Sequence, residues 1–293
     1  MREVRLVVIY FVGVVVLAAL LAPPLFWLGQ WAGATWSVRV LTSSGFERYF
    51  NRAILIAAVV LIFPLVRTLR IRSAEAAGLQ VGPRPWRMLV IGLASSLIIM
   101  VMEWIIIQST AWFPAGSGGA MAALPRILMT AVVVSVLEET LFRGVLQKIM
   151  MRGLGTAGLV LTALVFAAIH YVKPPAYAVT GPDVGWGSGF ALLPHAFWLF
   201  DLIPAATFAA LGALILAGLI LGRAALMSGG LALPFGIHAG WILGLEFMKK
   251  LLDRSEAVWP WIGQDLLGGV VPGLLLICQG VALECWYRRL KAK

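Results

Sequence analysis

The sequence predicts an all-α fold, a polytopic membrane bundle with about eight transmembrane helices. Two observations carry this prediction. Hydrophobic residues make up 61% of the chain and charged residues only 12%, whereas a soluble domain carries about 25% charged residues. Apolar runs of about 20 residues also recur from end to end, without the alternation of barrel strands. Because lipid offers the backbone no hydrogen-bond partners, such runs are expected to form helices.

The expected spans follow the apolar runs in order. The first, at 6–29, is longer than the apolar core of a signal peptide and has no clear A-x-A cleavage site after it, so we expect it to be retained. The others are expected at 53–66, 88–108, 127–147, 159–172, 202–221, 231–247 and 262–286. We expect residues 1–293 to form a single transmembrane domain.

Basic residues gather between the apolar runs. The clusters follow the second span, follow the fourth span and end the chain: Arg67, Arg70, Arg72, Arg84, Arg87, Lys148, Arg152, Arg288, Arg289, Lys291 and Lys293. With eight spans, all of them fall on one side, so both termini are expected in the cytoplasm, and the expected location is a prokaryotic inner (cell) membrane. Anionic headgroups therefore account for the net charge of +10, and no nucleic-acid partner is expected.

Ionisable side chains inside membrane spans are costly, and they are functional-site candidates by default. The fourth span contains the run EETLFRG, with Glu138, Glu139 and Arg143. The fifth span ends in FAAIH, with Phe166 and His170, and the seventh contains His238 in GIHAGW. We therefore expect a buried chemical site, because three of the spans carry two adjacent acids, an arginine and two histidines.

Helix geometry separates the two acids. Glu139 and Arg143 are four residues apart, so they share a helix face and can form an ion pair. Glu138 is rotated by about 100° from Glu139 and is left available for chemistry. Near a histidine from another span, a desolvated Glu138 could activate a water molecule as a general base.

These motifs resemble a known family of intramembrane proteases. EETLFR is similar to the E-E-x-x-x-R motif of the CAAX-protease and bacteriocin-processing (CPBP) family, which includes the Ras-converting CAAX prenyl endopeptidases. FAAIH is similar to the family's F-x-x-x-H motif, and HAGWI stands where the family has its third motif. The resemblance covers a core of about 127–247 and implies an endopeptidase that hydrolyses membrane-associated or lipid-modified protein substrates within the lipid bilayer.

The resemblance also implies roles for individual residues. Glu138 would be the catalytic base, His170 would assist with the water, and His238 would contribute to the oxyanion hole. Glu139, Arg143 and Phe166 would support the site, with no cofactor. The chain departs from the family pattern at one position, since Ile242 stands where the family's oxyanion-hole asparagine would fall. Trp241 could supply an indole N–H in its place.

Three alternatives stay open. In a zinc metalloprotease, Glu138, His170 and His238 would be the metal ligands. A non-catalytic scaffold or regulator of the same fold is favoured by Ile242 in place of asparagine. A transporter or proton channel could use paired carboxylates, but the remaining acids in the apolar runs are few and scattered, and no inverted repeat is visible.

Overall fold

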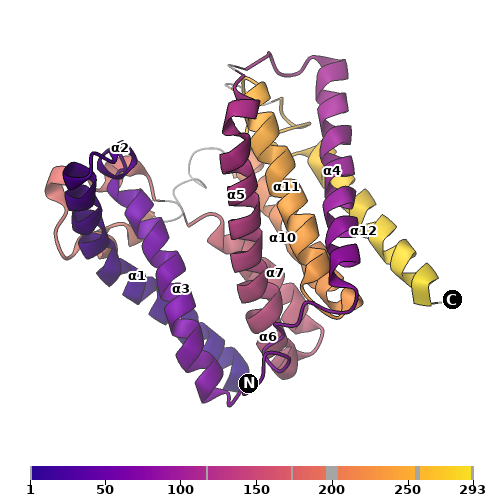
Figure 1. Cartoon of the computed structure of the whole chain (residues 1–293), viewed down its shortest axis with the longest axis horizontal. Helices are drawn as coiled ribbons and strands as arrows, with labels where there is room; N and C mark the ends of the chain where they lie inside the picture. The colour runs from indigo at the N-terminus through magenta and orange to yellow at the C-terminus, as the bar shows by residue number, and fades with distance from the viewer. Residues whose placement is uncertain (1, 117, 173, 196–203, 255–257, 292–293) are drawn as a thin grey trace. The chain divides into compact units, whose positions relative to one another are not determined.

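In the computed structural model (Figure 1), every named regular element is a helix within residues 2–116, 118–172, 174–195, 204–254 and 258–291, which are the residues that the structure describes. The only β-type pairings among them are two isolated bridges. The predicted all-α class is therefore confirmed. The chain divides into two compact units, Met1–Arg72 with Ala168–Pro204, and Ser73–Ala167 with Ala205–Lys293. The expectation of one transmembrane domain stays a prediction.

The first unit is built on two long antiparallel helices. Helix α1 packs against α3, and Tyr10 on α1 donates a hydrogen bond of 2.9 Å to the carbonyl oxygen of Ala58 on α3. The short helix α8 lies so close to α1 that a methyl group at Gly189 would collide with the backbone of Ala19. Its helices are α1 (Arg2–Thr35), α2 (Arg39–Thr42), α3 (Phe46–Thr68), η2 (Ala176–Ala178), η3 (Gly181–Asp183), α8 (Ser188–Ala191) and η4 (Leu193–His195).

The second unit is a bundle in which α11 lies against both α4 and α5, and α12 lies against α4 (Figure 1). The division between the units falls near the end of α7, so this helix lies mostly in the second unit. The helices are α4 (Pro85–Thr110), α5 (Ala120–Glu139), η1 (Thr140–Leu146), α6 (Gln147–Leu154), α7 (Ala157–Ile169), α10 (Pro204–Ser228), α11 (Ala232–Leu251) and α12 (Val270–Lys291).

Small residues let α4 and α11 approach closely. A methyl group at Gly92 would collide with the carbonyl oxygen of Leu233, and one at Gly236 would collide with the carbonyl oxygen of Leu89. Close backbone approach through glycine is a common way of packing helices in membranes, where van der Waals contact drives association. This packing fixes the side of α11 that turns toward α5, and with it the position of His238.

Six described helices are long and apolar enough to cross a membrane: Arg2–Thr35, Phe46–Thr68, Pro85–Thr110, Ala120–Leu154, Ala205–Ser228 and Val270–Lys291. The chain is thus an integral, multi-pass membrane protein, but the predicted count of eight is not confirmed. The fifth predicted span corresponds to α7, with only 13 residues. The seventh corresponds to α11, whose hydropathy is lowered by His238, Glu246, Lys249 and Lys250. The start of the sixth, at 202–203, lies outside the described residues.

Candidate active site

The central contact of the candidate site joins α5 to α11. The Nδ1 atom of His238 lies 2.8 Å from Oε1 of Glu139, and both side chains are buried. Because a buried carboxylate beside an arginine is an acceptor, this geometry places the proton on Nδ1 of the imidazole. The other ring nitrogen, Nε2, is then left for chemistry.

Arg143 holds Glu139 from the other side. Its Nε atom lies 3.3 Å from Oε2 of Glu139, and both side chains are fully buried. This confirms the ion pair that the spacing of four residues predicts. The guanidinium carbon also lies 4.1 Å from the centre of the Phe166 ring on α7, a cation–π contact. Its Nη2 donates a long hydrogen bond of 3.5 Å to the carbonyl oxygen of Gly218 on α10.

Arg143 does not lie in an ordinary α-helix. The segment η1, Thr140–Leu146, is a π-helix that directly follows Glu139 and continues into α6. Such wider turns inside α-helices are rare and occur frequently at functional sites. Here the wide turn lies between the two glutamates and the end of the span, and it contains the arginine that pairs with one of them.

Glu138 lies on the far side of the same imidazole. Its Oε2 atom is 3.9 Å from Nε2 of His238, and its side chain is 22% exposed. The rotation of about 100° between neighbouring helix residues therefore directs the two carboxyl groups to opposite nitrogens of one ring. At 3.9 Å the Glu138–His238 pair is too long for a direct hydrogen bond. Both glutamates thus lie beside the same histidine, and this shared contact was not predicted from the sequence.

Aromatic rings enclose this cluster. Phe166 meets His238 edge-on, with ring centres 6.1 Å apart, and it meets Phe142 in the same way at 5.3 Å. Sequence reasoning identified Phe166 but missed Phe142 and the Gly218 carbonyl. Phe142 lies inside the EETLFR run, so its position could have suggested it. A backbone carbonyl contributed by another helix leaves no signal in the sequence.

The charges of the four polar groups balance in one protonation state. Arg143 carries one positive charge, while Glu138 and Glu139 carry one negative charge each when ionised. An imidazolium at His238 would bring the sum to zero. Since unpaired charge is costly away from water, Arg143 is needed to offset the charge of the buried Glu139.

The remaining predicted site residues are His170, Trp241 and Ile242. His170 directly follows α7 and belongs to the first unit, so its role beside Glu138 stays a prediction. Trp241 is buried on α11, but its indole N–H donates to Oε1 of Gln279 on α12 at 2.9 Å. Gln279 in turn donates to Ser96 at 2.9 Å. The indole donor is therefore used in helix packing, against the suggestion that it replaces the missing asparagine. Ile242 is half-buried on α11.

A metal site was the alternative for Glu138, His170 and His238. Within the described part of the chain, no group of three or more His, Cys, Asp or Glu side chains lies in an arrangement that could hold a metal ion. Glu138 and His238 lie in the second unit and His170 in the first, so the geometry of this particular set stays untested. The zinc hypothesis is therefore left to experiment.

The fold and the cluster define a class: a polytopic membrane protein with a buried Glu–His–Glu arrangement backed by an arginine. Residues 120–243 match the family model described as type II CAAX prenyl endopeptidase Rce1-like. The matched segment contains EETLFR, FAAIH and HAGWI, so it confirms the resemblance that these motifs predict. Over these residues the chain is thus similar to the CAAX prenyl endopeptidases of the Rce1-like family. No curated protein and no solved structure matched the chain.

Proposed function

We propose that this protein is an intramembrane endopeptidase that hydrolyses peptide bonds in membrane-associated or lipid-modified proteins. The observation that carries the proposal is the position of His238, with Glu139 on one ring nitrogen and Glu138 near the other. The similarity of residues 120–243 to the Rce1-like family supports the same reaction. The bilayer is the second expected partner, since the chain has six candidate spans among its described helices.

In the proposed mechanism, Glu138 is the general base. A water molecule between its carboxylate and Nε2 of His238 would suit a separation of 3.9 Å, which is wider than a direct hydrogen bond. Glu138 takes one proton from this water as its oxygen attacks the substrate carbonyl carbon. When the peptide bond breaks, that proton passes to the leaving amine. Glu138 is then again a carboxylate and can activate the next water molecule.

Glu139 acts through His238 in this proposal. By accepting from Nδ1–H, it fixes the orientation of the ring and stabilises the imidazolium form. For this step His238 carries a second proton, taken up from solvent before the substrate binds, and its Nε2–H donates to the oxyanion that forms on the carbonyl without being transferred. Ile242 supplies no polar atom to assist, so we assign the protein's share of this stabilisation to His238. His170 would help to position the water, as the resemblance implies.

The distribution of basic residues supports an orientation for this reaction. We propose that both termini face the cytoplasm of a prokaryotic cell, with the enzyme in the cell membrane. Lys148 and Arg152 then lie at the cytoplasmic end of the helix that carries Glu138 and Glu139. Cytoplasmic substrates anchored to the membrane would reach the site from this end.

The proposal is tested by comparing peptide termini in cells that carry the native chain with those in cells that carry Glu138→Gln. The change removes the base but keeps the size of the side chain and one acceptor oxygen. We expect a set of new protein termini that depends on the native chain and is absent with the variant. A matched control is Glu246→Gln, because Glu246 is a half-buried acid on α11 that pairs with Lys249 at 2.8 Å. This control should preserve the termini.

A second candidate function is favoured by Ile242. If a side-chain amide is needed for the oxyanion, this chain would be a non-catalytic scaffold or regulator of the same fold. Identical termini with the native chain and with Glu138→Gln at equal expression would overturn the protease proposal. If a phenotype of a deletion strain is then rescued by both chains, the scaffold function is supported.

A further inference from the structure

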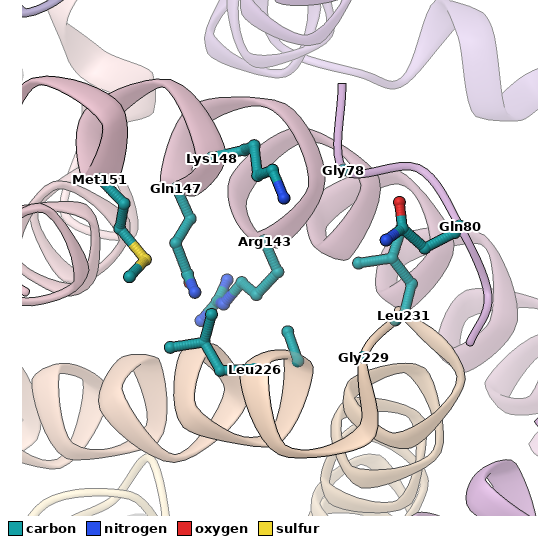
Figure 2. A pocket seen from close by; sticks show the side chains of 11 residues that line it. Gly78, Gln80, Arg143, Gln147, Lys148, Met151, Leu226, Gly229 and Leu231 are labelled. Atoms are coloured by element: carbon teal, nitrogen blue, oxygen red, sulfur yellow. The ribbon is translucent and has the colours of Figure 1, made fainter. Parts of the chain in front are cut away.

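A pocket of about 200 Å³ opens in the second unit, at an end of the bundle where several helices finish. Figure 2 shows its lining, which comes from the loop before α4, from η1 and α6, and from the end of α10 with the turn into α11. The helix Ala120–Leu154 ends nearby, and α11 begins there. In a membrane protein, such a position is near the level of the lipid headgroups.

The walls of this pocket are fixed by backbone hydrogen bonds. The N–H of Leu231 donates to the carbonyl oxygen of Gln80 at 3.0 Å, and the N–H of Ala232 donates to that of Val81 at 3.1 Å. On the opposite side, the Gln147 amide donates to the carbonyl oxygen of Gly222 on α10 at 3.0 Å. The loop before α4 and the turn into α11 are thus joined, so the pocket is formed before any ligand binds.

Positive charge gathers around the pocket. Arg143 and Lys148 both line it, and none of the lining residues is acidic. Lys148 is exposed and forms no ion pair with any residue that the structure describes. Arg143 lies deeper, and its buried Nη1 atom has no hydrogen-bond partner among the described residues. An uncompensated cation at the rim and a buried guanidinium behind it favour an anion.

The start of α11 adds to this field. The helix begins at Ala232, directly after the lining residue Leu231; no side chain caps its first turn, and the N–H of Ala232 already donates to the carbonyl oxygen of Val81. The N-terminus of a 20-residue helix carries a partial positive charge and suits a phosphate or carboxylate group. The helix dipole and Lys148 therefore attract an anion together, while the charge of Arg143 is paired with that of Glu139.

We propose that this pocket binds a phosphate group, either as the headgroup of a phospholipid or as free phosphate. The phosphate contacts Nζ of Lys148, and the buried Nη1 of Arg143 and the N-terminus of α11 add to the attraction. The position at the end of the spans favours the lipid source, since phospholipid phosphates lie at this level. Arg143 belongs both to the pocket and to the buried cluster with Glu139. The binding site does not depend on whether the protein is a protease.

The test measures how fast individual lysines of the purified full chain are acetylated by an amine-reactive ester. The protein is kept in maltoside detergent, and inorganic phosphate, phosphatidylglycerol or the phosphate-free lipid digalactosyl diacylglycerol is added. Peptide mass spectrometry then follows Lys148, with Lys250 of α11 as the internal reference. A phosphate source should slow acetylation of Lys148 about fivefold, from the attraction of roughly one cation to a headgroup. The galactolipid should have no effect.

Variants separate a specific site from general charge attraction. Lys148→Gln should weaken phosphate binding about fivefold, measured by equilibrium dialysis or by counting lipid adducts in native mass spectrometry. Lys250→Gln should leave binding unchanged. If inorganic phosphate slows the acetylation of Lys148, the free ion is enough to fill the pocket. If only phosphatidylglycerol slows it, the ligand is the lipid headgroup. Equal acetylation of Lys148 under all conditions, or equal binding by both variants, would overturn the proposal.

Discussion

His238 and Glu139 lie 99 residues apart in the sequence and 2.8 Å apart in the structure, through Nδ1 and Oε1. This contact joins the EETLFR run to the HAGWI run. It also gives the second glutamate of the EETLFR run a task that differs from that of the first. Glu139 is tied to both His238 and Arg143, while Glu138 is partly exposed beside Nε2.

The two glutamates should differ sharply in their effect on stability. Glu139→Gln leaves the buried Arg143 without its anion, so we expect a loss of about 3–5 kcal/mol in the free energy of unfolding. Glu138→Gln should cost less than about 1 kcal/mol, because this side chain is 22% exposed and water can solvate the amide that replaces the carboxylate. Unfolding in detergent, followed by circular dichroism with increasing denaturant, measures both. Equal losses would contradict the separate tasks assigned to the two residues.

Trp241 should matter for packing and not for catalysis. Trp241→Phe removes the donor to Gln279, and the unfolding free energy should fall by about 1–2 kcal/mol. Cleavage of any substrate found in the comparison of termini should keep its rate, because the indole N–H already has its partner on α12. A rate that drops tenfold in a stably folded variant would show instead that the indole serves the site.

Gly236 should tolerate no larger side chain. Gly236→Ala places a methyl group against the carbonyl oxygen of Leu89 and should separate α4 from α11, with a loss of about 1–3 kcal/mol. Gly212→Ala is the matched control, because a methyl group at this α10 position meets no other atom within 4 Å. The control should keep or slightly raise the melting temperature. If both variants melt alike, the close approach of α4 and α11 is not needed for stability.

Metal removal should leave the proposed reaction intact. The mechanism above uses Glu138 and His238 without an ion, so incubation with EDTA or 1,10-phenanthroline should not change the cleavage rate. The measurement needs purified protein and a substrate taken from the comparison of termini. Inhibition by both chelators, reversed by Zn²⁺ alone, would support the alternative in which Glu138, His170 and His238 bind zinc.

Helix geometry made part of the site predictable. The ion pair of Glu139 with Arg143 follows from a spacing of four residues, and it is present at 3.3 Å. The partner of His238 did not follow in the same way, because the sequence does not state which faces of two distant helices meet. Glycines on α4 and α11 set that orientation through close backbone packing. The contact of Arg143 with the carbonyl oxygen of Gly218 could not be predicted for a related reason. Every residue has a backbone carbonyl, so the sequence does not indicate which one the arginine meets.

The fold was predictable to the same degree. Long apolar runs identified six helices that reach the length of a span. The prediction of eight counted α11 and α7 as well, and these two carry the site residues His238 and Phe166. Polar residues lower the hydropathy of α11, and α7 is short. A count based on apolar runs is therefore least reliable for the helices that carry the chemistry.

The π-helical segment η1 makes the number of residues beside the glutamates as important as their identity. A π-helical turn holds about one residue more than an α-helical turn, because its hydrogen bonds run from residue i to i+5. Loss of one residue between Glu139 and Arg143 would thus allow an ordinary α-helix, but it would remove the spacing of four residues through which Arg143 pairs with Glu139. A redesign of this segment must therefore keep its number of residues, even where its side chains are replaced by similar ones.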